Sequence, residues 1–164
     1  MPIDRRCFLL SVSALAACGV QPAAKAASGP GAFANSPWRK LTPAEWAKRL
    51  PPASFNVLRQ EATETPFTSP LLNEHRRGVF ACLGCGLPLF KSEWKYDSGT
   101  GWPSFWTEIP GALLKKADYQ LIEERTEYHC AQCLGHQGHV FNDGPKPTGL
   151  RYCNNGVALR FLPA

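Results

Sequence analysis

The hydrophobic residues from position 79 onward form short apolar pieces that are separated by Gly, Pro, Asn and Asp. Pieces of this length, bounded by turn-forming residues, are typical of β-strands. No long stretch of helical periodicity interrupts them, so the pattern predicts a mainly β domain with two small antiparallel sheets. The expected strands are Val79–Ala81, Leu89–Lys91, Trp94–Tyr96, Leu113–Lys115, Tyr119–Ile122, Thr126–Cys130, Val140–Asn142, Leu150–Cys153 and Leu159–Leu162.

Two short helices are expected before the β region. Thr42-Pro43-Ala44-Glu45 is a capping box with proline at the first helical position, and it predicts a helix that ends near Leu50. The pair Pro51-Pro52 stops this helix, and a second helix is expected between about Ser54 and Glu61. Both helices should cover the core and carry no chemistry.

Residues 1–18 are typical of an export leader. Arg5-Arg6 resembles a twin-arginine motif, and the apolar run after it is too short to span a bilayer. Leu15-Ala16-Ala17-Cys18 is similar to a bacterial lipobox, in which Cys18 would be lipidated. Cleavage at Ala24-Lys25-Ala26 and a plain N-terminal membrane anchor are the alternatives. The leader predicts an exported protein of the periplasm or envelope, with a lipid anchor if the lipobox is used.

The composition fits one globular domain after this leader. Residues 19–36 are rich in Ala, Gly, Pro and Ser and are predicted to be a flexible linker, which leaves 37–164 for the domain. Hydrophobic residues make up 44% of the 164-residue chain and charged residues 19%, as in folded proteins. The net charge of +5 comes from scattered basic residues, so no basic patch predicts a nucleic-acid partner.

Two CxxC pairs, Cys82 with Cys85 and Cys130 with Cys133, predict a metal site. Each pair lies where an expected strand meets a loop, as in the knuckles of zinc ribbons, and four thiolates complete the tetrahedral shell of one Zn²⁺. No position is then left for water or substrate, so the ion is expected to be structural. Because the protein is expected to be exported, two local disulfides are the alternative.

Cys153 stands outside the two CxxC pairs and is a candidate nucleophile. Arg151 lies two residues earlier on the same expected strand, so both side chains should point to one face. A nearby cation favours the thiolate form of a cysteine. From spacing alone, a role as a small buried hydrophobic residue is an equally good interpretation.

Two histidines, His136 and His139, precede Cys153 in the same region. They are candidates for metal ligands, core histidines or proton donors, and the first role is disfavoured because four cysteines already satisfy the metal. Asp143 lies in the turn that follows and is a candidate to orient a histidine by accepting its N–H. A plain turn residue is the alternative for Asp143.

An unusual run, Ser98-Gly99-Thr100-Gly101-Trp102-Pro103-Ser104-Phe105-Trp106, lies in the middle of the β region. Its two glycines permit a sharp loop that would display Trp102. An exposed indole offers a flat apolar wall for a methyl or thioether group. The alternative is that both tryptophans of the run belong to the core.

Taken together, these stretches resemble the B-type methionine sulfoxide reductases, which reduce the R epimer of methionine sulfoxide. The resemblance covers about residues 38–162 and is specific, because many blocks match in one order; it favours a catalytic Cys153 over a buried one. The matching blocks are Thr63-Glu64-Thr65-Pro66-Phe67-Thr68, Cys82-Leu83-Gly84-Cys85-Gly86, Asp97-Ser98-Gly99-Thr100-Gly101-Trp102-Pro103-Ser104-Phe105, His136-Gln137-Gly138-His139-Val140-Phe141 and Pro147-Thr148-Gly149-Leu150-Arg151-Tyr152-Cys153.

The resemblance implies a β-tent of two antiparallel sheets, with short N-terminal helices and a structural zinc bound by four cysteines. It implies that Cys153 is the catalytic cysteine, that Trp102 packs on the methyl group of the substrate, and that His139 bonds or protonates the sulfoxide oxygen. The other residues matched to the family's site are the second histidine and three polar residues: His136, Asp143, Arg151 and Asn155, of which we group Asn155 with the catalytic residues.

The implied reaction is the thiol-dependent repair of methionine R-sulfoxide, free or within proteins. The Cys153 thiolate attacks the sulfoxide sulfur and is left as a sulfenic acid, which an external reductant such as a thioredoxin-like protein restores. Many family members carry a resolving cysteine in the loop before the tryptophan, and here that position is Thr100. The chain is therefore expected to form no internal disulfide during turnover.

Three positions depart from the family pattern. Gln137 replaces the usual Leu between the histidines, Asn154 replaces an aliphatic residue after Cys153, and Gly156 replaces Ser. Asn154 should face the opposite side of its strand from Cys153. These departures predict altered packing or rate, and no loss of the chemistry.

Two functions of other classes compete with the enzyme. A non-catalytic zinc β-tent module that binds a ligand would need the Trp102 wall, but it would not need Cys153, His139 and Asn155. The joint presence of these residues favours the enzyme. A zinc-ribbon nucleic-acid binder would need a basic patch, which the sequence does not contain.

Overall fold

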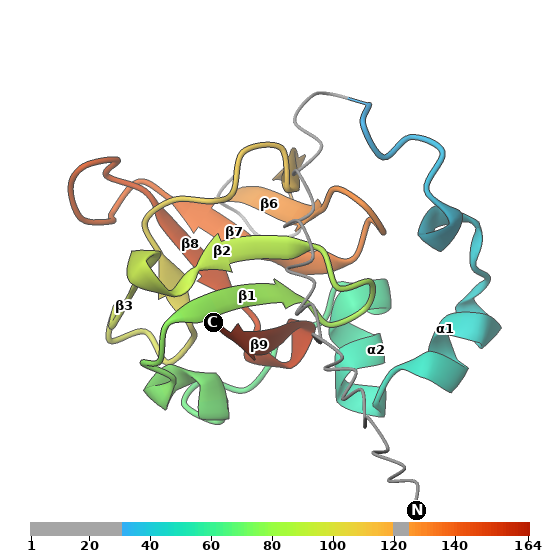
Figure 1. Ribbon diagram of the computed structural model, residues 1–164, viewed down its shortest axis with the longest axis horizontal. Helices are drawn as coiled ribbons and strands as arrows, with labels where there is room; N and C mark the ends of the chain where they lie inside the picture. The colour runs from blue at the N-terminus through green and yellow to red at the C-terminus, as the bar shows by residue number, and fades with distance from the viewer. Residues whose placement is uncertain (1–30, 120–124) are drawn as a thin grey trace, which may run out of the picture.

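The N-terminal part of the domain contains two short helices. The computed structural model describes residues 31–119 and 125–164 (Figure 1), so the leader and most of the linker expected at 1–18 and 19–36 lie outside the described residues. Within the described residues, no helix is long and apolar enough to cross a membrane. The helices are α1, Pro43–Arg49, and α2, Pro52–Gln60, preceded by the 3₁₀ turn Pro37–Lys40.

The capping box at the start of α1 is confirmed. The Thr42 side chain accepts a hydrogen bond from the Glu45 backbone N–H at 3.3 Å, and the Glu45 carboxylate accepts one from the Thr42 backbone N–H at 2.8 Å. The prolines act differently from expectation, because Pro52 begins α2 two residues before the expected start at Ser54. A proline suits the first turn of a helix, where its missing N–H would have no partner within the helix.

The rest of the domain is built from two antiparallel sheets, as expected. One sheet has three strands in the order β2-β1-β9, and the other has six in the order β3-β4-β8-β7-β6-β5. The strands are β1 Gly78–Cys82, β2 Pro88–Lys91, β3 Lys95–Tyr96, β4 Ser104–Phe105, β5 Leu113–Asp118, β6 Arg125–Cys130, β7 His136–Phe141, β8 Arg151–Asn154 and β9 Leu159–Pro163. Short 3₁₀ turns occur at Pro70–Asn73, Ser92–Trp94 and Gly156–Ala158.

Three strand predictions differ from the structure. β5 ends at Asp118, so Tyr119 does not begin a strand, and the rest of the expected strand Tyr119–Ile122 lies outside the described residues. The two-residue strand β4 was not expected, because a piece so short leaves no alternation to detect. β7 begins at His136, not at Val140, because β6 and β8 flank this strand and bury its polar first half.

Aromatic side chains fill the space between the two sheets. Phe80 and Phe90 of the small sheet are fully buried, as are Phe105 and Tyr128 of the large sheet. The Phe90 and Phe105 rings stack with centroids 4.1 Å apart, and the Phe90 and Tyr128 rings meet edge to face. Figure 1 shows β1, β2 and β9 lying across β6, β7 and β8, with the two helices to one side. This core fixes β1 and β6, the strands that end in the first cysteine of each CxxC pair.

Candidate active site

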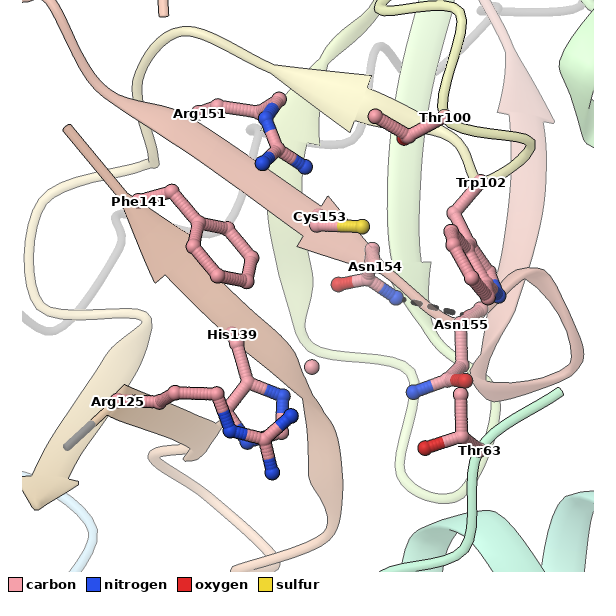
Figure 2. A pocket seen from close by; sticks show the side chains of 11 residues that line it. Thr63, Thr100, Trp102, Arg125, His139, Phe141, Arg151, Cys153, Asn154 and Asn155 are labelled. Carbon is pink, nitrogen blue, oxygen red and sulfur yellow. Dashed lines mark hydrogen bonds between the residues drawn. The ribbon is translucent and has the colours of Figure 1, made fainter. Parts of the chain in front are cut away.

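A cavity of about 250 Å³ lies over β7 and β8, between these strands and the glycine-rich loop. The residues that line it include Thr100, Trp102, His139, Arg151, Cys153 and Asn155. Figure 2 shows Cys153 on the side of β8 that faces Trp102. Five of the seven residues predicted for catalysis or substrate binding therefore line one cavity, and a sixth, Asp143, is hydrogen-bonded to the lining residue Arg151.

Strand register places His139 beside Cys153. The two residues are directly opposite each other in the antiparallel pair of β7 and β8. Opposite residues in such a pair project their side chains on the same face of the sheet. Gly138 permits the close approach of the strands, since a Cβ at this position would lie 1.9 Å from the Cys153 carbonyl oxygen. The backbone itself therefore brings a histidine next to the cysteine.

The environment of Cys153 favours its thiol form over the thiolate. Burial raises the pKa of Cys153, and the Arg151 guanidinium and the Thr100 hydroxyl lower it without cancelling this effect. Arg151 favours the thiolate, as expected, but burial has the larger effect on the pKa of Cys153. The desolvation of a charged sulfur outweighs one partly buried cation. The thiol proton must therefore leave before the sulfur attacks.

The carboxylate that contacts His139 is Asp118, not Asp143. His139 Nε2 donates to Asp118 Oδ2 at 2.8 Å, and Arg125 Nη2 contacts the same oxygen at 2.7 Å. Burial lowers the pKa of His139, and the hydrogen bond to Asp118 opposes this shift. With Nε2 bonded to Asp118, the ring has a fixed orientation and Nδ1 remains for the substrate side. No local pattern of residues points to Asp118, because the register of β5, β6 and β7 determines its position.

Asp143 instead orients Arg151. Its two carboxylate oxygens accept hydrogen bonds from Arg151 Nε and Nη2, both at 2.8 Å. The Arg151 hydrogen bonds lower the pKa of Asp143. The guanidinium also lies over the Phe141 ring, 4.3 Å from its centroid. The result is a fixed cation beside Cys153.

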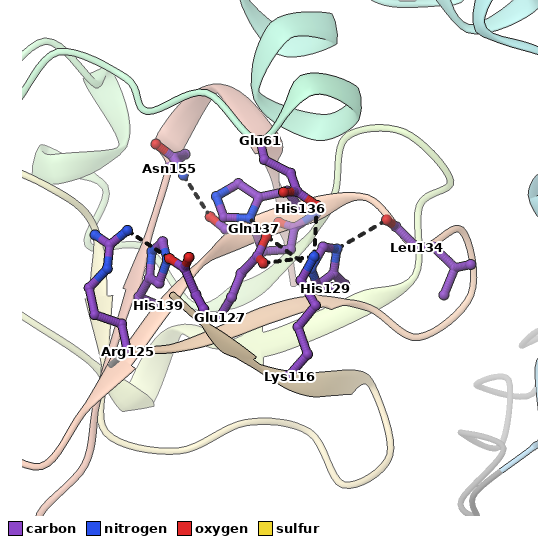
Figure 3. A network of polar contacts seen from close by, with 11 residues as sticks. Glu61, Lys116, Arg125, Glu127, His129, Leu134, His136, Gln137, His139 and Asn155 are labelled. Atoms are coloured by element: carbon purple, nitrogen blue, oxygen red, sulfur yellow. Dashed lines mark hydrogen bonds and ion pairs between the residues drawn. The ribbon is translucent and has the colours of Figure 1, made fainter. Parts of the chain in front are cut away.

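His136 does not line the cavity. Its side chain is buried, and Nδ1 contacts the Glu127 carboxylate (Figure 3). Burial lowers the pKa of His136. Burial raises the pKa of Glu127, but hydrogen bonding to Lys116 and the neighbouring histidines hold it below the usual value. The centroids of the His136 and His139 rings are 5.5 Å apart, so the His136 ring packs against the active-site histidine.

Trp102 forms one wall of the cavity. Gly99 and Gly101 have φ angles of 69° and 90°, the left-handed conformation that glycine adopts most readily. The sharp loop predicted for this run is confirmed. The indole Nε1 donates to the Glu64 carbonyl at 2.9 Å, which fixes the ring with one face toward the cavity.

Asn155 holds the segment that carries the Trp102 acceptor. Its Oδ1 accepts from the Glu64 backbone N–H at 2.8 Å, and its Nδ2 donates to the Gln137 carbonyl at 3.0 Å. Figure 3 shows this second bond. Asn155 thus ties the Trp102 wall to β7. No local pattern of residues marks Glu64 as a link between them.

The four CxxC cysteines converge as a separate cluster outside the cavity. Their sulfurs lie within 4.8 Å of one another, with contacts of 3.6 Å between Cys82 and Cys133 and 3.4 Å between Cys85 and Cys130. Four sulfurs at about 2.3 Å from a tetrahedral ion would be separated by about 3.8 Å, whereas a disulfide requires about 2.05 Å. All four thiols are free, so the structure does not contain the two local disulfides considered above. The cluster fits a tetrahedral metal ion.

A cysteine opposite a carboxylate-oriented histidine, beside an aromatic wall, defines a thiol-dependent enzyme site. The family described as SelR domain matches residues 50–163. A peptide methionine sulfoxide reductase MsrB of Agrobacterium fabrum is 46% identical over 130 residues, which cover 79% of this chain and 96% of that protein. The human methionine-R-sulfoxide reductase B2, mitochondrial, is 47% identical over 132 residues, covering 75% and 72%. The chain therefore belongs to the SelR domain family, the B-type methionine sulfoxide reductases.

Among solved structures, the "Yippee-like" domain of Mis18 aligns with a TM-score of 0.44 and 15% identity. The alignment covers 54% of this chain and 98% of that domain. A likeness at this level is too distant to support an argument about the fold or the function.

Proposed function

We propose that this protein reduces methionine R-sulfoxide to methionine, as a repair enzyme for oxidised proteins. The observation that carries the proposal is the cross-strand pair of His139 and Cys153 beside the Trp102 wall. Named relatives with 46% and 47% identity support the same reaction. A non-catalytic module would use the wall alone, and nothing in the comparisons supports that alternative.

The cavity suits the end of a methionine sulfoxide side chain. Its volume of about 250 Å³ holds a small group, and the Trp102 face offers apolar contact to the methyl on sulfur. The sulfoxide oxygen would point toward His139 on the other side of Cys153. A chiral sulfur with its methyl fixed on one wall and its oxygen on the opposite donor fits in only one hand. The site should therefore select one epimer, and the human relative named as a methionine-R-sulfoxide reductase supports the R epimer.

The chemistry follows from this placement. A sulfoxide sulfur is a poor electrophile until its oxygen accepts a proton, which His139 supplies as general acid. The Cys153 thiol gives its proton to His139, which replaces the proton delivered to the sulfoxide oxygen, and the thiolate attacks sulfur. The sulfur–oxygen bond of the substrate breaks, and the oxygen ends with its proton on Cys153 as a sulfenic acid. Two electrons pass from Cys153 to the substrate, which leaves as the thioether. Arg151 stabilises the anionic sulfur before attack.

Regeneration would need an external thiol. Thr100 occupies the place of the resolving cysteine and bonds to the sulfur of Cys153 without offering a thiol. Among the described residues, the other cysteines all belong to the metal cluster. A thioredoxin-like protein would attack the sulfenic acid, release water and then leave as its own disulfide. After one equivalent of substrate, mass spectrometry should find a sulfenic acid on Cys153, whereas a disulfide to any cluster cysteine would contradict this route.

The ion bound by Cys82, Cys85, Cys130 and Cys133 would be a structural Zn²⁺, one per chain. When bound, the ion would contribute free energy to folding. It would have no open coordination site for catalysis, since four thiolates fill the tetrahedron. Such a thiolate donor set favours Zn²⁺ over Mg²⁺ or Ca²⁺.

The protein would act outside the cytoplasm. Arg5-Arg6 and the short apolar run support twin-arginine export of a folded, metal-loaded protein to the periplasm or envelope. Cys18 would carry a lipid anchor if the lipobox is processed. Replacing both arginines by lysine should retain the protein inside the cell, and loss of fatty-acid labelling in Cys18→Ala tests the anchor separately. Unimpaired export of the lysine variant would contradict this route.

The reaction is tested with a mixture of the two epimers of methionine sulfoxide, free and within a peptide. The wild-type protein with a dithiol reductant should consume the R epimer and leave the S epimer, and Cys153→Ser should consume neither. If no epimer is consumed while ligand still binds, the binding module becomes the better description.

A further inference from the structure

Two polar side chains lie in the core next to the cysteine cluster. Gln137 belongs to β7, and Asn154 belongs to β8, the strand that carries Cys153 and is called the catalytic strand below. Both have a relative exposure of 0%. They occupy positions where the family pattern has aliphatic residues. A buried amide without a partner costs about 1–3 kcal/mol by protein mutational data, so two such residues are tolerated only if they bond to each other or to their surroundings.

The two amides form one continuous chain of hydrogen bonds. Gln137 Nε2 donates to Cys82 Sγ at 3.4 Å, and Gln137 Oε1 accepts from Asn154 Nδ2 at 3.4 Å. Asn154 Oδ1 in turn accepts from the Tyr128 hydroxyl at 3.0 Å. Asn154 Nδ2 also donates to the Asn155 carbonyl at 2.9 Å. A path of direct contacts therefore runs from a metal-cluster sulfur to the residue that follows Cys153.

A metal-bound thiolate would fix the direction of this chain. A thiolate has no hydrogen to donate, so the amide nitrogen of Gln137 must face the Cys82 sulfur. The Gln137 oxygen then faces Asn154, which turns the Asn154 oxygen toward the Tyr128 hydroxyl. A protonated or oxidised sulfur is a weaker acceptor and would not impose this order.

The backbone of Gln137 strengthens the same connection. Its carbonyl accepts from the Asn155 backbone N–H at 2.8 Å and from Asn155 Nδ2 at 3.0 Å. Gln137 is therefore attached to the end of the catalytic strand through its side chain and its main chain. Any displacement of its amide on loss of the metal would be felt at both Asn154 and Asn155.

We propose that Gln137 and Asn154 are positioning residues that link the Cys82 thiolate to the catalytic strand, so that metal retention and the placement of Cys153 depend on each other. The inference rests on the zinc proposed above. Hydrogen bonds to a metal-bound ligand hold it in place, and their removal typically lowers metal affinity about 10- to 100-fold. The family-typical aliphatic pair would lack this link.

The test compares Gln137→Leu, Gln137→Met, Asn154→Val and the double variant Gln137→Leu/Asn154→Val. Zinc content is measured first, and then the rate at which zinc-loaded protein gives up its metal to a coloured chelator. Gln137→Leu should release zinc about tenfold faster than wild type. Gln137→Met keeps the length of the side chain without its donor, and it should behave alike if the leucine variant folds poorly. Gln132→Ala is the control, because this glutamine between Cys130 and Cys133 is not part of the chain of hydrogen bonds that runs from Cys82 through Gln137, and the change should leave release unchanged.

The Asn154 variant tests the coupling between metal retention and the catalytic strand, because the hydrogen bonds of the Asn154 side chain go to Gln137, Tyr128 and Asn155 and not to a sulfur. Asn154→Val should also accelerate zinc release, by less than Gln137→Leu, and the double variant should equal Gln137→Leu because both changes act through one link. Zinc-loaded Gln137→Leu should in addition lose about threefold in kcat/KM. If both Gln137 variants release zinc at a rate within twofold of wild type, the proposed link is wrong, while the zinc site itself still stands. Faster release with an additive double variant or an unchanged kcat/KM would overturn the coupling, and a wild-type protein without metal would overturn the zinc site together with it.

Discussion

The four-cysteine cluster and the cavity around Cys153 both present thiols, but the chain builds them differently. In the cluster, each CxxC pair is a local unit, and only two such units need to meet. In the cavity, His139, Cys153 and Trp102 come from two strands and a loop, and cross-strand register aligns them. The cluster sulfurs are mostly buried against one another, whereas Cys153 faces an open space. Changes in the first region should therefore affect folding, and changes in the second should affect chemistry.

Cys130→Ser should have the largest effect. Structural zinc contributes about 10–16 kcal/mol of apparent binding free energy in small domains, as much as the total stability of about 5–15 kcal/mol. The variant should be insoluble or unfolded, which circular dichroism and zinc analysis of the soluble fraction will show. A folded, active Cys130→Ser protein, or folded wild-type protein without metal, would contradict a structural metal.

Cys153→Ser should abolish the reaction and spare the fold. The expected loss in kcat/KM is about 10³-fold or more, because no other group can form the sulfenic acid. Zinc content and Tm should stay those of the wild type, since Cys153 makes no contact with the cluster. A variant that unfolds or loses its metal would show that the Cys153 side chain itself supports the cluster, in addition to the proposed link through Gln137 and Asn154.

Asp118→Asn should weaken the acid function of His139 and change its pH dependence. Burial lowers the pKa of His139 and the Asp118 bond raises it, so removal of the Asp118 charge lowers that pKa further. As pH rises, His139 then loses its proton at a lower pH than in the wild type. At neutral pH less of the acid form remains, so kcat/KM should fall about tenfold. The measurement is the pH profile of kcat/KM.

Asp143→Asn is the matched control for this shift. It removes a carboxylate from Arg151 and leaves the bond between Asp118 and His139 in place. In the pH profile of kcat/KM, the fall at higher pH that is assigned to His139 should therefore keep its midpoint. An equal displacement in both variants would mean that the limb reports the general field of the site and not His139.

Trp102→Ala should have the smallest effect of these changes. Loss of the apolar wall should raise KM about threefold, with little change in kcat, because the wall contacts the methyl and not the reacting atoms. Trp106→Phe is the control, since Trp106 packs against Trp94 and does not line the cavity. A large fall in kcat at unchanged KM would assign Trp102 a role in the transition state.

The cluster could be predicted from the sequence almost completely. Each CxxC pair, Cys82 with Cys85 and Cys130 with Cys133, supplies two ligands at a spacing that can be recognised in the sequence. The position of each pair where a strand meets a loop indicates a zinc knuckle. The helices and most strands were also predictable, because capping residues and turn residues act locally. The early start of β7 was not, because burial by two flanking strands overrides the polar pattern of its first residues.

The cavity was predictable only in part. Cys153, His139 and Trp102 were found through the resemblance, but Asp118 was assigned no role and Asp143 was considered for the wrong partner. A carboxylate 21 residues from its histidine can be recognised only when the register of the intervening strands is known. Glu64 was missed for the same reason, since the Asn155 bond that holds it spans 91 residues.

The pairing of β1 with β9 has a consequence for the order in which the protein is made. Cys82 ends β1, and its partner across the ladder is Leu159 in β9. A ribosome synthesises both CxxC pairs before it reaches β9, so the strand that carries Cys82 must wait for one of its two neighbours. During this interval the thiols are presented on an unfinished sheet to whatever metals and oxidants the compartment of synthesis contains. Completion of the fold, and with it the protection of these sulfurs, therefore waits until β9 has been made.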